Sequence, residues 1–187
     1  MKLDKRIIIA LVVVIGLIAI MFTPVGTAIK KMMEGDEHVV GIRDEKISDN
    51  DFDVDLIGYN GAENSNLLKL KNSGEVVFLN FWGSWCPPCV EEMPSIQKLY
   101  EAKGQKVKFV LLAIQDKPKT ITSFLEKNGY TMPVYEAASP ISANLLPHVF
   151  PTTYIFNKKG EIVLKETKTR DWNDEEINTL LDKLIAE

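Results

Sequence analysis

The chain has 187 residues, enough for one ordinary domain and an appendage, and 45% of them are hydrophobic, enough for a packed core. Four of its 22 basic residues but only one of its 26 acidic residues lie in the first thirty positions. The remainder has 18 basic against 25 acidic residues, a net charge of −7. A domain this acidic has no obvious basic surface for nucleic acid, so we expect no nucleic-acid partner.

The first thirty residues predict a membrane anchor. A short basic tail at 1–6 precedes an uncharged, largely apolar run at 7–29, and a spanning helix needs about 20 such residues. The alternative is a cleaved signal peptide, for which TPVGTAIKK (23–31) is a poor cleavage motif. We expect one transmembrane helix with the N-terminus in the cytoplasm, although the bases at 30 and 31 weaken the charge rule for this orientation.

A polar linker at 30–50 leads into a folded domain at 51–187. FDVDLI (52–57) alternates apolar and acidic residues, which favours a half-buried edge strand, and GYNG (58–61) has the composition of a turn. SNLLKLKNSG (65–74) is typical of a short helix that a glycine closes.

The next three elements predict a βαβ unit. VVFLNFW (76–82) and KVKFVLLAI (106–114) are almost wholly apolar, as strands buried on both faces are. Between them, PPCVEEMPSIQKLYEAKG (87–104) predicts a helix, and a right-handed crossover then makes the two strands parallel. The apolar stripe of this helix comprises Val90, Met93, Ile96 and Tyr100.

After this unit we expect a helix at 119–129, a short strand at 131–137 and one or two helical turns at 141–146. TTYIFN (152–157) and EIVLKET (161–167) flank the turn KKG and predict a hairpin.

NDEEINTLLDKLIAE (173–187) predicts a closing amphipathic helix, which Asn173 caps. Its sheet-facing side comprises Ile177, Leu180, Leu181, Leu184 and Ile185. The elements together predict a three-layer α/β sandwich with a mixed sheet.

The only two cysteines, Cys86 and Cys89, lie in FWGSWCPPCVEEMP (81–94). A structural zinc site needs four ligands, and the chain offers only two histidines besides. A disulfide across so small a loop restricts the unfolded chain little, so a structural staple is a poor interpretation as well. A CxxC pair beside a βαβ pattern is typical of a redox site.

The spacing gives the two thiols different tasks. Cys86 begins the helix, where unpaired backbone N–H groups stabilise a thiolate, and Cys89, one turn on and buried beneath it, is placed to attack a mixed disulfide. Pro87 and Pro88 have no N–H, so we expect the amide of Cys89 to be the donor to the Cys86 sulfur. With fewer donors, the thiolate should be stabilised less than it would be with a donor-bearing residue at 87.

VVFLNFWGSWCPPCVEEMP (76–94) and VFPTTYIFNKKGEIV (149–163) resemble the thioredoxin superfamily, and more narrowly its membrane-anchored disulfide reductases of the TlpA/ResA type. The resemblance covers about residues 50 to 187. It implies a thioredoxin-like sandwich with an N-terminal β-hairpin and a central αβ insertion. Residues 52–61 and 119–137 match these two additions.

The resemblance also implies roles for single residues. Cys86 and Cys89 match the redox pair. Trp85 matches an aromatic residue that shields the sulfur and contacts partners, and Pro151 matches a cis-proline whose loop pairs with the partner's backbone. We expect Phe150, which precedes this proline, to contact the substrate as well.

Glu92 matches an acid that, in some family members, assists deprotonation of the second cysteine. Its i,i+3 spacing puts it on the same helix side as Cys89, and the alternative is an ordinary first-turn acid that complements the helix dipole. Asn80 replaces the aspartate of ordinary thioredoxins and is interpreted as a buried amide that satisfies nearby backbone. His148, three residues before Pro151, is interpreted as a loop residue, and the alternative is that it borders the site. Pro87 stands where ResA-type members often have an acid, which weakens the case for a dedicated cytochrome-maturation role.

A dithiol outside the cytoplasm is oxidised by default, so a reductase there must receive electrons. We therefore expect a periplasmic, membrane-tethered thiol-disulfide oxidoreductase of the bacterial cytoplasmic membrane. Its partners would be disulfide-bearing exported proteins, apocytochrome c among them, and a membrane thiol transporter as electron donor. It needs no metal and no cofactor beyond the Cys86–Cys89 disulfide.

Three alternatives stay open: an oxidase or isomerase with the same site, a copper-handling protein, and a non-redox adaptor. The cysteine spacing is one residue shorter than the CxxxC of related copper proteins, and an adaptor would not need both thiols.

Overall fold

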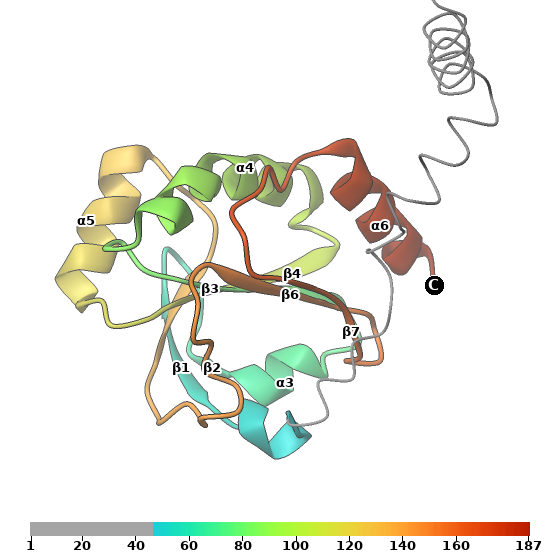
Figure 1. The fold of residues 1–187 in the computed structure, drawn as a ribbon, viewed down its shortest axis with the longest axis horizontal. Coiled ribbons are helices and arrows are strands. Elements are labelled where there is room, and N and C mark those ends of the chain that lie inside the picture. Colours follow the sequence, from blue (N-terminus) through green and yellow to red (C-terminus); the bar gives the residue numbers. More distant parts are fainter. Residues whose placement is uncertain (1–46) are drawn as a thin grey trace, which may run out of the picture. The chain divides into compact units, whose positions relative to one another are not determined.

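A computed structural model of the protein describes residues 47–187 (Figure 1). The expected tail, the expected anchor at 7–29 and most of the expected linker lie outside the described residues. None of the helices within residues 47–187 has the length and hydrophobicity that crossing a bilayer requires.

One mixed sheet of seven strands forms the centre of the described unit. The strands are β1 (Asp55–Tyr59), β2 (Ser65–Asn66), β3 (Val76–Trp82), β4 (Val107–Ala113), β5 (Val134–Ala137), β6 (Thr152–Phe156) and β7 (Ile162–Glu166). Their order across the sheet is β2-β1-β5-β4-β3-β6-β7, with β3/β4 and β4/β5 parallel and the other pairs antiparallel. The predicted parallel βαβ unit, the N-terminal hairpin and the C-terminal hairpin are confirmed.

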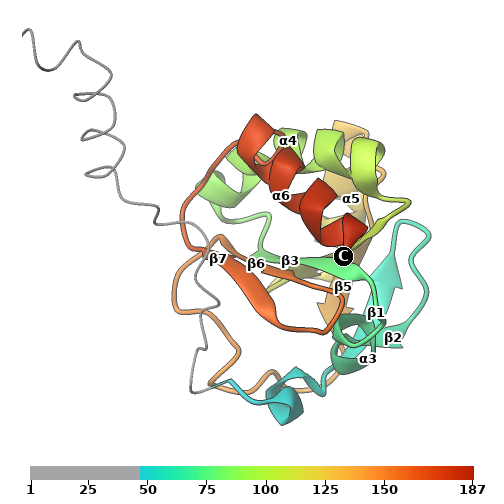
Figure 2. The same ribbon diagram turned by 90° about the vertical axis from the view of Figure 1, so that its right-hand side faces the viewer.

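Helices lie on both faces of this sheet. They are α3 (Leu67–Lys71), α4 (Pro87–Lys103), α5 (Pro118–Asn128) and α6 (Glu175–Ala186), with a 3-10 turn η1 (Asp49–Phe52) before β1. In Figures 1 and 2, α4, α5 and α6 cover one face and α3 lies on the other. The predicted three-layer arrangement is confirmed.

Strand β3 separates two hydrophobic cores, because successive side chains of a strand point to opposite faces. All seven of its residues are buried. Val76, Phe78 and Trp82 belong to the core beneath α4 and α6, whereas Val77, Leu79 and Phe81 belong to the core on the α3 side. The same alternation turns Asn80, between Phe78 and Trp82, toward α4.

The buried face of α4 is only partly the predicted one. Met93 and Ile96 are buried as expected, but Val90 and Tyr100 are only half-buried. The other buried positions are Cys89, Glu92, Gln97 and Leu99. An acid, an amide and a thiol thus occupy places that a hydrophobic pattern assigns to apolar residues.

Three predictions are wrong: the edge position of β1, the first residue of α3 and the cap of α6. Strand β1 is not an edge strand, because the turn at 60–61, with φ of 61° and 81°, folds Ser65–Asn66 back against its outer side. The helix predicted from residue 65 therefore starts only at Leu67, and Asn66 caps it.

The segment 141–146 forms a single hydrogen-bonded turn, the shorter of the two lengths predicted for it. Its backbone bonds to Ser142 come from Leu145 and Leu146, and the following Pro147 disfavours helical geometry at the residue before it. Helix α6 is capped by Asp174, whose carboxylate accepts a bond from the amide of Ile177, and not by Asn173.

Candidate active site

The redox pair, Cys86 and Cys89, lies at the N-terminus of α4, after the short loop that follows β3. Cys86 is the N-cap of α4, and Pro87 and Pro88 occupy the first positions of the helix, where a backbone N–H has no partner in the helix. The amide of Cys89 donates to the Cys86 sulfur at 3.3 Å, as predicted from the missing N–H groups of the prolines.

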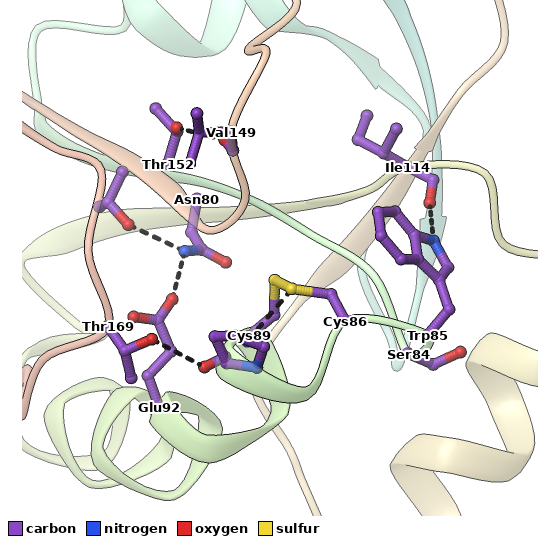
Figure 3. Close-up of a disulfide and its surroundings, with 12 residues drawn as sticks. Asn80, Ser84, Trp85, Cys86, Cys89, Glu92, Ile114, Val149, Thr152 and Thr169 are labelled. Carbon is purple, nitrogen blue, oxygen red and sulfur yellow. Dashed lines mark hydrogen bonds between the residues drawn. A yellow bond between two sulfur atoms is a disulfide. The ribbon is translucent and has the colours of Figure 1, made fainter.

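Cys86 and Cys89 form a disulfide in this structure (Figure 3). Cys86 retains 4% exposure, whereas Cys89 is completely buried. Cys86 is therefore the sulfur that an incoming group would meet first.

The exposed Trp85 stands beside the disulfide. Its side chain is 48% exposed, although the indole N–H donates to the carbonyl of Ile114 at 2.8 Å. Its ring meets the ring of Phe150 edge to face, with centroids 5.6 Å apart. Asp116 accepts bonds from both the amide and the hydroxyl of Ser84, so the loop that precedes the cysteines is anchored to the end of β4.

The Phe150–Pro151 peptide bond is cis, as the family resemblance implied. Thr152, just after it, donates from its hydroxyl to the carbonyl of Val149 at 2.8 Å and closes a tight loop. Val149 is 56% exposed at the tip of this loop. Trp85, Phe150 and Val149 thus form an apolar rim that we call the docking rim.

Glu92 lies on α4, three residues after Cys89, and its carboxyl group points toward Asn80 of β3 (Figure 3). It is 1% exposed. The Nδ2 of Asn80 donates to its Oε1 at 2.9 Å, and the indole N–H of Trp172 donates to its Oε2 at 2.8 Å. Burial raises the pKa of Glu92 to about 7, and these donors, with the backbone N–H of Arg170, lower it in part.

Asn80 is buried as predicted, but it does not satisfy the backbone. Its Nδ2 donates to the side chains of Glu92 and Thr153, because β4 and β6 pair with both edges of β3 and occupy the backbone there. Its Oδ1 has no hydrogen-bond partner among the described residues. His148 is exposed in the loop before Pro151, as its interpretation as a loop residue predicted.

Sequence reasoning missed Trp172 and Asp116. Trp172 is 80 residues from Glu92 along the chain and stands in the polar stretch TKTRDWND (167–174). A lone large aromatic residue in such a stretch is the signal that could have indicated a buried contact. Asp116 has no comparable signal, since an acid after a strand is usually solvated.

A Redoxin family profile matches residues 51–181. The thiol-disulfide oxidoreductase ResA of Halalkalibacterium halodurans is 38% identical over 110 residues, which are 57% of this chain and 60% of that protein, less than two thirds of its length. The sporulation thiol-disulfide oxidoreductase A of Bacillus subtilis is 29% identical over 119 residues, which are 58% of this chain and 72% of that protein.

Solved structures show the same architecture. The crystal structure of a DsbF homologue from Corynebacterium diphtheriae aligns with a TM-score of 0.53 and 28% identity, over 71% of this chain and 84% of that one. The fold is therefore thioredoxin-like. Because the family profile spans most of the chain and includes both cysteines, the protein belongs to the Redoxin family.

Proposed function

We propose that the protein is a membrane-tethered thiol-disulfide oxidoreductase that reduces disulfides of exported proteins with the dithiol of Cys86 and Cys89. One observation carries this proposal: a CxxC pair at a helix N-terminus, with its outer sulfur next to the exposed Trp85 and with a buried carboxyl group, Glu92, one turn along the helix from its inner sulfur. The similarity to proteins named thiol-disulfide oxidoreductases supports it.

The first step is attack by the Cys86 thiolate on one sulfur of the partner's disulfide. A mixed disulfide forms, and the partner's other sulfur leaves as a thiolate that takes up a proton. Helix α4 aids this step, since the helix N-terminus and the amide of Cys89 stabilise negative charge on the Cys86 sulfur.

The second step is release of the partner. The thiol of Cys89 gives its proton to the Glu92 carboxylate, and the resulting thiolate attacks the Cys86 sulfur. The Cys86–Cys89 disulfide forms while the partner's second sulfur leaves as a thiolate, which takes up the proton that Glu92 accepted. Two electrons and two protons have then passed from the dithiol to the partner. A pKa of Glu92 near 7 suits a group that accepts and returns a proton at neutral pH.

The docking rim would bind the partner. Trp85 and Val149 are among the few large hydrophobic side chains exposed in residues 47–187, and both lie on loops that adjoin the redox pair. Phe150, next to Pro151, packs against Trp85, and the partner's backbone would lie along the loop at 149–151.

The direction of electron flow follows from the expected location. With the anchor at 7–29 and the domain outside the cytoplasm, the dithiol must be regenerated by a thiol-bearing transporter in the same membrane. Tethering keeps the domain close to that donor. Apocytochrome c before haem attachment is one exported protein whose cysteine pair must be reduced.

The test is a single-turnover reaction of the reduced full chain with a peptide that carries a disulfide of the apocytochrome c type. We expect wild type to reduce about one disulfide per dithiol. Cys89→Ala should stop at a mixed disulfide between Cys86 and the peptide, and Cys86→Ser should not react.

Mass spectrometry of the quenched mixtures distinguishes these products. A wild-type protein whose two thiols react with a small maleimide but leave the peptide disulfide intact would overturn the proposal.

A further inference from the structure

The segment 167–173, between β7 and α6, crosses the first turns of α4, and we call it the strap (Figures 1 and 2). The hydroxyl of Thr169 donates to the carbonyl of Pro88 at 3.3 Å. The amide of Trp172 donates to the hydroxyl of Ser95 at 3.0 Å. The strap is thus hydrogen-bonded to α4 on both sides of the position of Glu92.

The side chain of Trp172 is fixed in this arrangement. It is completely buried, and its ring meets Phe78 of β3 edge to face at 5.0 Å. On its other side the guanidinium of Arg170 lies 5.4 Å from the ring. The indole therefore has little freedom, and its N–H remains directed at Oε2 of Glu92.

We propose that Trp172 is a positioning residue of the redox site, whose indole N–H orients the Glu92 carboxylate beside Cys89 and stabilises its ionised form. The proposal rests on the proposed function, in which Glu92 takes the proton of Cys89. It adds to the proposed function a residue that lies 80 positions after Glu92 in the sequence.

The physical reason is the cost of a buried negative charge. A carboxylate away from water is stable only when donors replace the water, and a hydrogen bond to an ion is stronger than one between neutral groups. Glu92 has three such donors: Asn80 from β3, and Trp172 and the backbone of Arg170 from the strap.

The charged groups near Glu92 do not replace these donors in stabilising its carboxylate. Glu166 at the end of β7 opposes its ionisation. The guanidinium of Arg170 is paired with Asp174 and Glu176. Cys89, one turn away on the same helix, is held in the disulfide and does not titrate in the oxidised protein. Removal of the Trp172 donor should therefore favour the protonated form of Glu92.

The chain contains a matched control. Trp82 is also completely buried, yet its indole N–H has no partner among the described residues. Trp172→Phe and Trp82→Phe each remove one indole from the same core, so they create similar losses of packing. Only the first removes a donor from Glu92.

The experiment measures the pKa of Glu92 in the oxidised full chain by carboxyl ¹³C NMR, with Glu92→Gln to assign the resonance. We expect Trp172→Phe to raise this pKa by about one pH unit and Trp82→Phe to leave it unchanged. Then the mixed disulfide between Cys86 and a small aromatic thiol is prepared, and the release of that thiol by Cys89 is followed against pH. Its midpoint should rise by the same amount in Trp172→Phe alone.

A measurement on the wild type covers the case in which Trp172→Phe does not fold. The indole N–H resonance of Trp172 should titrate with a midpoint near that of Glu92, at about 7, and that of Trp82 should not. Glu92→Gln should abolish the titration.

Equal Glu92 pKa values in Trp172→Phe and wild type, or an indole resonance that ignores pH, would overturn the positioning role even if the protein still reduces disulfides. A raised pKa without a shift in the release profile would overturn it too. A wild type that never forms or resolves a mixed disulfide refutes the proposed function instead.

Discussion

Glu92 is a carboxyl group with 1% exposure, one turn along α4 from the buried Cys89. Most buried carboxylates are paired with a cation, but the groups that bond to Glu92 are an amide, an indole and a backbone N–H. Neutral donors stabilise the ion without forcing it to stay ionised. The side chain can therefore change its protonation state near neutral pH, which a tight ion pair would prevent.

This residue should give the fold a pH dependence. Its pKa is raised from 4.5 to about 7, so the folded chain binds the proton more tightly than the unfolded chain. The stabilisation is complete below about pH 4.5 and is lost as the pH rises through about 7. Relative to Glu92→Gln, we expect wild type to lose on the order of 3 kcal/mol of unfolding free energy over that range.

Urea denaturation of the oxidised proteins at several pH values measures this difference. The glutamine variant also alters hydrogen bonds, but that effect is constant with pH and leaves the slope interpretable. If the unfolding free energies of wild type and Glu92→Gln changed with pH in the same way, the expectation would be contradicted.

The two prolines after Cys86 should weaken the stabilisation of its thiolate. Pro87→Gly adds an N–H in the first turn of α4, so we expect the pKa of the Cys86 thiol to fall. Below the pKa, each unit of that fall increases the thiolate fraction about tenfold. The rate of alkylation by iodoacetamide against pH measures it. Pro94→Ala, which adds an N–H farther along the same helix, should leave the thiol unchanged, and equal effects of the two substitutions would contradict the local explanation.

Among the elements, α6 and the strap depend on one cap. The carboxylate of Asp174 accepts a bond from the amide of Ile177 at 2.8 Å and also pairs with Arg170 of the strap. Asp174→Ala should cost about 1 kcal/mol of unfolding free energy through the cap alone. Asp174→Asn should retain most of that amount, because asparagine caps helices equally well.

Urea denaturation at neutral pH ranks these variants. Asn173→Ala is the control, since the neighbouring asparagine does not cap α6, and its effect should stay within about 0.5 kcal/mol. If the two alanine variants were equally destabilised, the cap would not lie at Asp174.

The elements that could be predicted are those whose pattern is local. Strands β3 and β4 are continuous apolar runs, and the hairpin of β6 and β7 has a glycine turn between two such runs. Strand β2 has two polar residues, and only its pairing with β1 makes it a strand. No pattern within the segment can reveal that. The segment 141–146 has a local apolar pattern, and its apolar residues pack into the core from the single turn that this pattern allowed.

At the scale of the whole molecule, the expected anchor stays a prediction, since 7–29 lies outside the described residues. We expect the full chain to sediment with membranes and to resist extraction with about 1 M salt, because a spanning helix buries roughly 20 apolar residues. Removal of residues 1–30 should transfer the protein to the soluble fraction with its redox activity intact.

Cell fractionation measures the membrane association, and mass spectrometry of the N-terminus shows whether the segment is cleaved. An impermeant maleimide that labels reduced Cys86 in intact cells would place the domain outside. A soluble wild type that begins near residue 30 would favour the cleaved signal peptide instead.

The site was predictable where one motif contains it. Cys86, Cys89 and Trp85 are adjacent in the sequence, and the family resemblance brought Pro151 with them. The burial of Trp172 had a signal in the sequence, but its partner could not be predicted, because the contact with Glu92 spans 80 residues and exists only after α4 and the strap have packed together. The contact between Trp172 and Glu92 is therefore visible only in the folded structure.

The unequal exposure of the tryptophans has a practical consequence. The chain contains three, and Trp82 and Trp172 are fully buried while Trp85 is half open to solvent. Quenching of intrinsic fluorescence by acrylamide should therefore report on Trp85 alone. A bound partner that covers this indole would protect it, so the protein already contains an optical probe of its own docking.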